Sequence, residues 1–142
     1  MDHTHWMIVA NGSCMKLFKF RERERTLERP SVTLHPESTL MQKDFDSDKK
    51  GKPPRGYGHD PETMSTKKIE EKKFAKEISH FLKESFEKKE FERLYIAASP
   101  TFLGLLREEL PKDILNHIAE ETNKDLTKVP SSEIWGHFPS RK

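Results

Sequence analysis

The residues best suited to binding chemistry lie together near the middle of the chain, in a stretch from Lys49 to His59 that we call the basic segment. It contains four Lys or Arg, three Gly and two Pro, and no Asp or Glu. Such cations can contact phosphates, and a neighbouring aromatic ring can stack on a base. The candidate nucleic-acid-binding residues are Lys49, Lys50, Lys52, Arg55, Tyr57 and His59. The competing interpretation is a solvated loop without a ligand.

Residue types that carry catalysis do not form a recognised pattern. Cys14 is the only cysteine, so it forms no internal disulfide, and as a nucleophile it would need an adjacent base. The seven histidines show no His-Glu-x-x-His zinc pattern. Gly51, Gly56 and Gly58 do not match a phosphate-binding Walker loop. We therefore expect no catalytic residue, no metal and no cofactor, with a hydrolase of unrecognised type as a minority alternative.

The overall charge is close to balance, with 26 Lys and Arg against 24 Asp and Glu. This balance provides no global attraction to nucleic acid or acidic membranes, so such binding would depend on a local patch. The longest apolar run, Trp6 to Ala10, is too short to cross a bilayer, and the first residues lack the features of a signal peptide. These observations predict a cytoplasmic protein without membrane insertion.

The N-terminal part predicts a β-hairpin over residues 5–21. An apolar run from Trp6 to Ala10 precedes Asn11-Gly12, a pair that tolerates the positive φ of a tight turn. Apolar residues then lead into the alternating charges of residues 21–25, which are typical of a solvated strand end or loop.

Beyond the hairpin, the hydrophobic pattern predicts a long helix and several shorter elements. The helix is expected from about residue 61 to 89, because Phe74, Ile78 and Leu82 recur at helical spacing and Ile69 leads into them. The other predicted elements are an edge strand at 27–35, a buried strand at 91–98, a helix at 101–110 and a helix that starts at 130–133.

Ser99 and Pro100 mark a junction between the buried strand and the helix that follows. Ser99 is a suitable cap and Pro100 suits the first helical position, which leaves Phe102 and Leu106 to be buried. Residues 112–122 fit a helix or a strand equally well from local pattern alone. The pattern as a whole predicts an α/β fold with a mixed central sheet, an N-terminal β-hairpin and packed helices.

The chain length suits one domain, residues 1–142. Within it, a basic Gly- and Pro-rich stretch at about residues 43–60 has no apolar anchor, so we expect a mobile loop there.

Five regions, in order along the chain, carry a family resemblance; the second of them includes both Phe45–Ser47 and His59–Pro61. They are Trp6–Ser13 with Lys16–Phe18, Phe45–Ser47, His59–Pro61, Glu71–Ile78, Leu94–Arg107 and Lys124–Thr127. Together they resemble the host attachment protein family, the proteins required for attachment to host cells. The resemblance implies a strand at about residues 115–121. It also implies kinship with the middle domain of archaeal and eukaryotic class 1 release factors, which has a ribonuclease-H-like fold.

In those release factors, a mobile Gly-Gly-Gln loop enters the peptidyl transferase centre of the ribosome. The glycine-rich stretch here lies in the comparable place, between the strands and a long helix. The chain has no Gly-Gly-Gln, so peptidyl-tRNA hydrolysis is not implied. We therefore expect a non-enzymatic, release-factor-like module that contacts the ribosome or structured RNA. The alternative is a protein-interaction or regulatory factor that affects attachment to host cells or surfaces without nucleic-acid contact.

Overall fold

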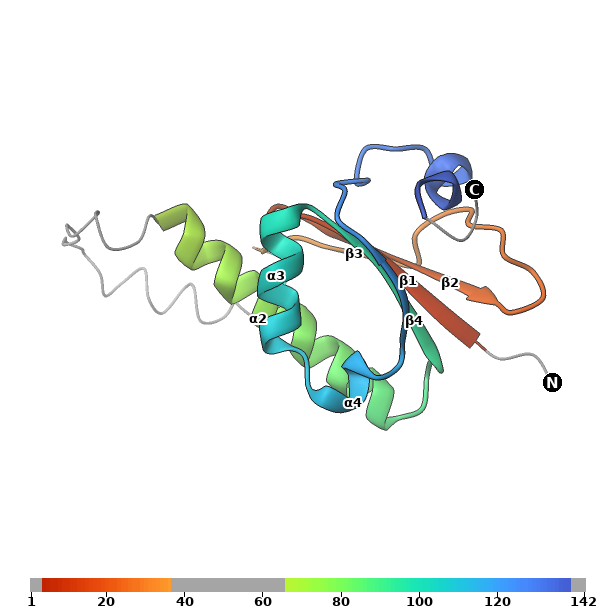
Figure 1. Ribbon diagram of the computed structural model, residues 1–142, viewed down its shortest axis with the longest axis horizontal. Helices are drawn as coiled ribbons and strands as arrows, with labels where there is room; N and C mark the ends of the chain where they lie inside the picture. The colour runs from red at the N-terminus through yellow and green to blue at the C-terminus, as the bar shows by residue number, and fades with distance from the viewer. Residues whose placement is uncertain (1–3, 37–65, 139–142) are drawn as a thin grey trace.

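In the computed structural model, which describes residues 4–36 and 66–138, five strands form one mixed sheet with helices packed on it (Figure 1). The elements in chain order are β1 (Thr4–Ala10), β2 (Met15–Arg21), β3 (Val32–Leu34), α2 (Thr66–Glu87), β4 (Arg93–Ala98), α3 (Pro100–Glu109), α4 (Lys112–Leu115), β5 (Ile118–Thr122) and the 3-10 helix η2 (Ser131–His137). The predicted α/β class, N-terminal hairpin and packed helices are confirmed.

The strand order across the sheet is β3-β2-β1-β4-β5. β1 pairs antiparallel with β2 and parallel with β4, while β3 pairs antiparallel with β2 and β5 pairs parallel with β4. Four strands therefore point the same way and only β2 opposes them. The ends of β1, β3, β4 and β5 consequently lie along one side of the sheet, which we call the carboxyl edge. The opposite side, where β1, β4 and β5 begin, is the amino edge.

The alternation of side chains along β1 divides the interior into two cores. Trp6, Ile8 and Ala10 face the helices, and α2 and α3 cover this side of the sheet (Figure 1). From α2, the side chains of Phe74 and Ile78 fill this first core, and both are almost fully buried. The helical spacing of these residues in the sequence predicted this arrangement correctly.

The second core lies on the opposite face of the sheet. Met7 and Val9 of β1 point into it, and the segment after β5 returns across this face to cover them. The short helix η2 supplies Ile134, and Phe138 follows directly after it. The predicted helix start at 130–133 is thus confirmed as the start of a 3-10 helix.

Arg25 fixes the connection between β2 and β3. Its guanidinium carbon lies 5.9, 5.7 and 5.4 Å from the ring centroids of Phe20, Tyr95 and Trp135. The indole Nε1 of Trp135 also donates a 2.7 Å hydrogen bond to the carbonyl oxygen of Arg25. Residues 21–24 are exposed, as predicted for a solvated strand end, but the same expectation is wrong for Arg25.

We expect Arg25→Ala to lower the free energy of unfolding by about 1–2 kcal/mol, because it removes a partly desolvated cation from three aromatic rings together with its aliphatic packing. Arg25→Met keeps most of the packing and loses the charge, so the difference between the two variants isolates the cation–π contribution. Urea unfolding measures both. Equal stabilities for Arg25→Ala and the wild type would show that this contact does not hold the connection.

The hairpin is confirmed, but the expectation that Asn11 takes the positive φ of a tight turn is wrong. Ala10 pairs with Met15, so four residues connect β1 to β2. The side-chain Oδ1 of Asn11 accepts hydrogen bonds from the backbone N–H groups of Ser13 (2.7 Å) and Cys14 (3.0 Å). Asn11 therefore closes the turn through its side chain, as Asn commonly does, and its φ is not positive.

The predicted ambiguity of residues 112–122 has a simple explanation, because both alternatives are present. The stretch begins with α4 and continues into β5, which starts at Ile118, later than the expected 115. The third strand is shorter than expected and begins at Val32, because Leu27 packs into the second core instead.

Two further expectations about side chains are wrong. Ser99 occupies the cap position of α3, but its hydroxyl makes no capping hydrogen bond, and its carbonyl oxygen accepts from Leu103 N–H at 2.8 Å. Ile69 does not lead into the core, because its side chain is 45% exposed on the first turns of α2. The predicted start of that helix before residue 66 lies outside the described residues.

Candidate functional site

All six candidate residues of the basic segment lie outside the described residues, between Pro36 and Thr66. They are Lys49, Lys50, Lys52, Arg55, Tyr57 and His59. The structure therefore leaves their role as a prediction. The structure does describe the chain on both sides of this stretch, up to Pro36 and again from Thr66.

Residues on both sides of this stretch contact the turn that joins β1 to β2 at the carboxyl edge. On the β3 side, His35 Nδ1 lies 3.3 Å from the carbonyl oxygen of Ser13. On the α2 side, Glu71 lies over Gly12 so closely that a Cβ there would fall 2.6 Å from the Glu71 Cγ. A side chain at position 12 would therefore displace the Glu71 side chain from this contact. In α/β proteins, ligands bind outside the carboxyl ends of the strands, so this edge is the first place to seek a site.

A hydrogen-bond network ties the same turn to the segment after β5. Asn11 Nδ2 donates to Asp125 Oδ2 at 2.9 Å and to Thr127 Oγ1 at 3.2 Å. The Thr127 hydroxyl donates to Asp125 Oδ1 at 2.7 Å, and Lys16 Nζ donates to the Thr127 carbonyl oxygen at 2.6 Å. Because these groups satisfy one another, we interpret the network as structural support for the carboxyl edge.

The first turns of α2 carry exposed cations next to this edge. Lys67, Lys68, Lys72 and Lys73 are all exposed, as is Glu70, whereas Glu71 is half-buried. Figure 1 shows this end of α2 reaching past the sheet. Asp60 and Glu62 separate these lysines from the basic segment in the sequence, so the start of α2 is a second, separate group of cations.

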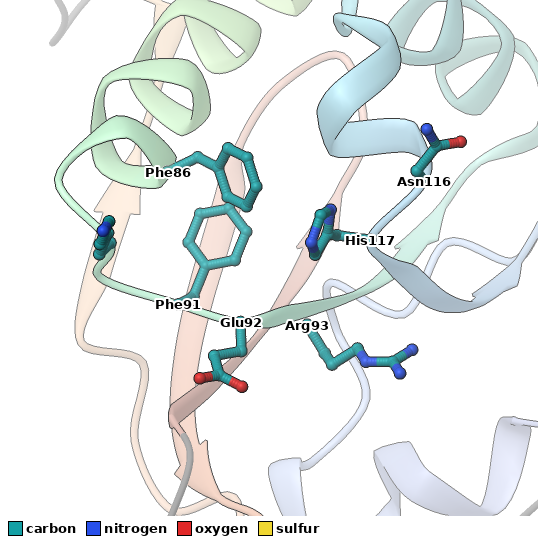
Figure 2. A pocket seen from close by; sticks show the side chains of 7 residues that line it. Phe86, Phe91, Glu92, Arg93, Asn116 and His117 are labelled. Atoms are coloured by element: carbon teal, nitrogen blue, oxygen red, sulfur yellow. The ribbon is translucent and has the colours of Figure 1, made fainter.

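At the amino edge, a cleft of about 590 Å³ lies between the end of α2 and the start of β5 (Figure 2). We call it the amino-edge cleft. Its aromatic lining comes from Phe86, Phe91 and His117. Its polar lining comes from Lys89, Glu92, Arg93 and Asn116. The sequence analysis missed this site, because its residues come from separate elements and form no local motif.

Comparison with known families agrees with the resemblance noted in the sequence. Residues 6–138 match the family model described as "Protein required for attachment to host cells". The chain belongs to this family. No curated protein matches it. The family description suggests a role in attachment to host cells, and the match runs through both edges described above.

Partial burial affects the thiol of Cys14. Partial burial raises the pKa of its thiol and outweighs the opposing effect of Lys16. A reactive cysteine needs the opposite shift, because the thiolate is the nucleophile. Within residues 4–36 and 66–138, no three His, Cys, Asp or Glu side chains gather in a way that could hold a metal ion. In the same ranges, no helix is long and apolar enough to cross a membrane.

The pKa of Asp125 predicts how the network responds to acid. Partial burial raises the pKa of this carboxyl, but hydrogen bonds from Asn11 and Thr127 outweigh burial and bring the pKa below its ordinary value of 3.8. A lowered pKa in the folded state means that the ionised carboxyl stabilises the fold above about pH 3.8. This contribution is lost as the pH falls through the folded-state pKa.

We therefore expect Asp125→Asn to be less stable than the wild type at neutral pH, with a difference that shrinks below about pH 4. Thermal unfolding of both proteins between about pH 3 and 7 measures this difference. Asp113→Asn is the matched control, because Asp113 is another exposed carboxylate of the host attachment protein. A wild-type advantage that stays constant down to the lowest pH would contradict the assigned role of the Asp125 carboxylate.

Proposed function

We propose that this family member is a non-enzymatic module that contacts structured RNA, ribosomal RNA included, through its basic segment. The observation that carries the proposal is that residues on both sides of the basic segment, His35 after β3 and Glu71 on the second turn of α2, contact the same turn at the carboxyl edge. The chain before and after the basic segment is therefore tied to one turn of the sheet. A segment held at both ends loses less conformational entropy on binding than a free tail.

The charge distribution supports a polyanionic partner. The basic segment has four cations and no acid in a chain whose net charge is only +2. The start of α2 carries a second group of four exposed lysines. Cations that neutralise phosphates release counterions, and this release is a favourable contribution to binding that depends steeply on salt. Tyr57, between two glycines, is suited to stacking on an unpaired base.

The position of the segment supports the release-factor-like interpretation. It lies between β3 and the long helix α2, which is the comparable place to the Gly-Gly-Gln loop of the release-factor middle domain. Because the chain lacks Gly-Gly-Gln, the proposal includes contact without peptidyl-tRNA hydrolysis. Under this proposal, the attachment role suggested by the family is indirect, because a protein bound to RNA does not itself touch a host cell.

Co-sedimentation with ribosomes over a salt series tests the proposal. The full chain is expected to pellet with ribosomes at about 50 mM salt and to remain in solution at about 200 mM. Structured RNA in solution should show the same trend in a direct binding assay. Absence of binding to both at low salt would favour the alternative, a protein-interaction or regulatory factor without nucleic-acid contact.

A further inference from the structure

The amino-edge cleft combines rings and polar groups in a way that the basic segment does not explain. His117 packs edge-on against Phe86, with ring centroids 4.8 Å apart, and its Nδ1 lies 2.8 Å from the carbonyl oxygen of Asp113. Figure 2 shows the imidazole directed at the rings of Phe86 and Phe91. These contacts hold His117 in place although the residue is exposed. One side of the cleft is therefore an ordered aromatic surface.

The rest of the lining supplies three kinds of polar group. Lys89 and Arg93 are exposed cations, Asn116 presents an amide, and Glu92 presents a carboxylate. Cations suit a phosphate, an amide suits the edge of a base, and a carboxylate accepts hydrogen bonds from ribose hydroxyls. The cleft volume of about 590 Å³ lies within the range of small-molecule sites.

Lys89, which lines the cleft, has a backbone conformation that is unusual for lysine. Its φ of 58° makes it the only non-glycine residue with positive φ in the described part of the chain. Lys89 N–H donates to the Phe86 carbonyl oxygen at 2.9 Å, and Glu90 N–H donates to the Ser85 carbonyl oxygen at 3.0 Å. This is the Schellman motif that ends helices, in which the position of Lys89 usually holds glycine. Strained residues of this kind cluster at functional sites, and here the strained residue contributes a cation to the cleft.

We propose that the amino-edge cleft binds a nucleotide, with the base against His117 and the phosphate between Lys89 and Arg93. The Asn116 amide then forms hydrogen bonds with the edge of the base, and the Glu92 carboxylate accepts hydrogen bonds from the ribose hydroxyls. The ligand is either a free nucleotide or one nucleotide unit of a single-stranded RNA. The inference does not depend on the proposed function of the basic segment.

Titration of the ¹⁵N-labelled full chain with AMP, followed by NMR, tests the proposal. The amide signals of Arg93, Asn116 and His117 are expected to shift saturably. Ribose 5-phosphate should shift them less, and inorganic phosphate least, because neither has a base to stack. An adenine hexanucleotide that binds tighter than AMP identifies the RNA strand as the ligand, whereas equal affinities identify the free nucleotide. Absence of a saturable shift with any nucleotide, or identical shifts with inorganic phosphate, would overturn the proposal.

Lys89→Gly provides a sharper test, because the two possible roles of this residue predict different results. Glycine relieves the strain at positive φ, so the melting temperature should rise by about 2–5 °C. The loss of the cation should weaken AMP binding by about tenfold. His117→Ala should weaken it severalfold, and His117→Phe should retain most of the affinity, because it keeps a ring for stacking. A Lys89→Gly variant that is more stable and binds AMP as tightly as the wild type would contradict the phosphate role.

The basic segment supplies the control that separates this inference from the proposed function. Changing Lys49, Lys50, Lys52 and Arg55 to Ser should leave AMP binding in the cleft unchanged. If this variant instead loses the AMP-dependent shifts at Arg93, Asn116 and His117, the nucleotide is bound elsewhere and the assignment of the cleft is wrong.

Discussion

Phe102→Ala should lower the free energy of unfolding by about 3–5 kcal/mol, as expected for truncation of a buried aromatic side chain. Phe102 is only 1% exposed and lies in the first core, where α3 packs against α2. Its ring centroid lies 5.8 Å from that of Phe74. The alanine variant therefore leaves a cavity between two helices and the sheet, and neither helix can move in without losing its own contacts with β1 and β4.

Thr101→Ala is the matched control, because Thr101 is the neighbouring residue on α3 and is exposed. It should change stability by no more than about 0.5 kcal/mol. Urea unfolding of both variants, with far-UV circular dichroism to confirm folding, gives the comparison. If Phe102→Ala were within about 1 kcal/mol of the wild type, the assignment of Phe102 to the first core would be wrong.

Elements with a strong local signal were predictable from the sequence. The spacing of Phe74, Ile78 and Leu82 predicted the buried face of α2, and the apolar run from Leu94 to Ala98 predicted β4. In both cases the spacing of apolar residues follows from burial, because the side chains on one face of a helix, or along a central strand, pack into the core. The mixed sheet followed from the order of these elements.

Contacts between distant parts of the chain were not predictable. Asn11 suggested a tight turn, but its side chain bonds to Asp125 and Thr127, more than a hundred residues away. Arg25 lies in a run of alternating charges that is typical of a solvent-exposed segment, yet aromatic rings from three separate elements lie around its guanidinium. Tertiary contacts override local propensity at such positions.

The same distinction applies to the candidate sites. The basic segment was recognised because its cations are adjacent in sequence, and its role remains a prediction. The amino-edge cleft was missed because Phe86, Arg93 and His117 meet only after folding. The positive φ of Lys89 at the end of α2 likewise became visible only in the structure.

Neutralising the basic segment should have the largest effect on the proposed RNA contact. In a variant with Lys49, Lys50, Lys52 and Arg55 changed to Ser, up to four phosphate contacts are lost. Each contact contributes about 0.9 to the slope of log affinity against log salt, so the slope should decrease by about 3–4. Four contacts also account for a roughly hundredfold loss of wild-type affinity between 50 and 200 mM salt. The variant should lose most of this dependence.

A second variant controls for net charge. Changing Lys83, Lys88, Lys112 and Lys124 to Ser removes the same four charges from exposed positions on α2, α4 and the loops beside α2 and β5. If RNA binding depends on the overall charge of the chain, both quadruple variants weaken it equally. If the basic segment makes the contact, the control variant retains the wild-type slope within about one unit.

The most direct test is therefore the affinity of the wild type and the two quadruple variants for structured RNA and ribosomes at several ionic strengths. Melting temperatures of all three proteins should be recorded alongside, to show that each remains folded. The proposal predicts that only the basic-segment variant binds more weakly and with a flatter salt dependence, at an unchanged melting temperature. Indistinguishable binding curves for the three proteins, or no wild-type binding even at low salt, would contradict it.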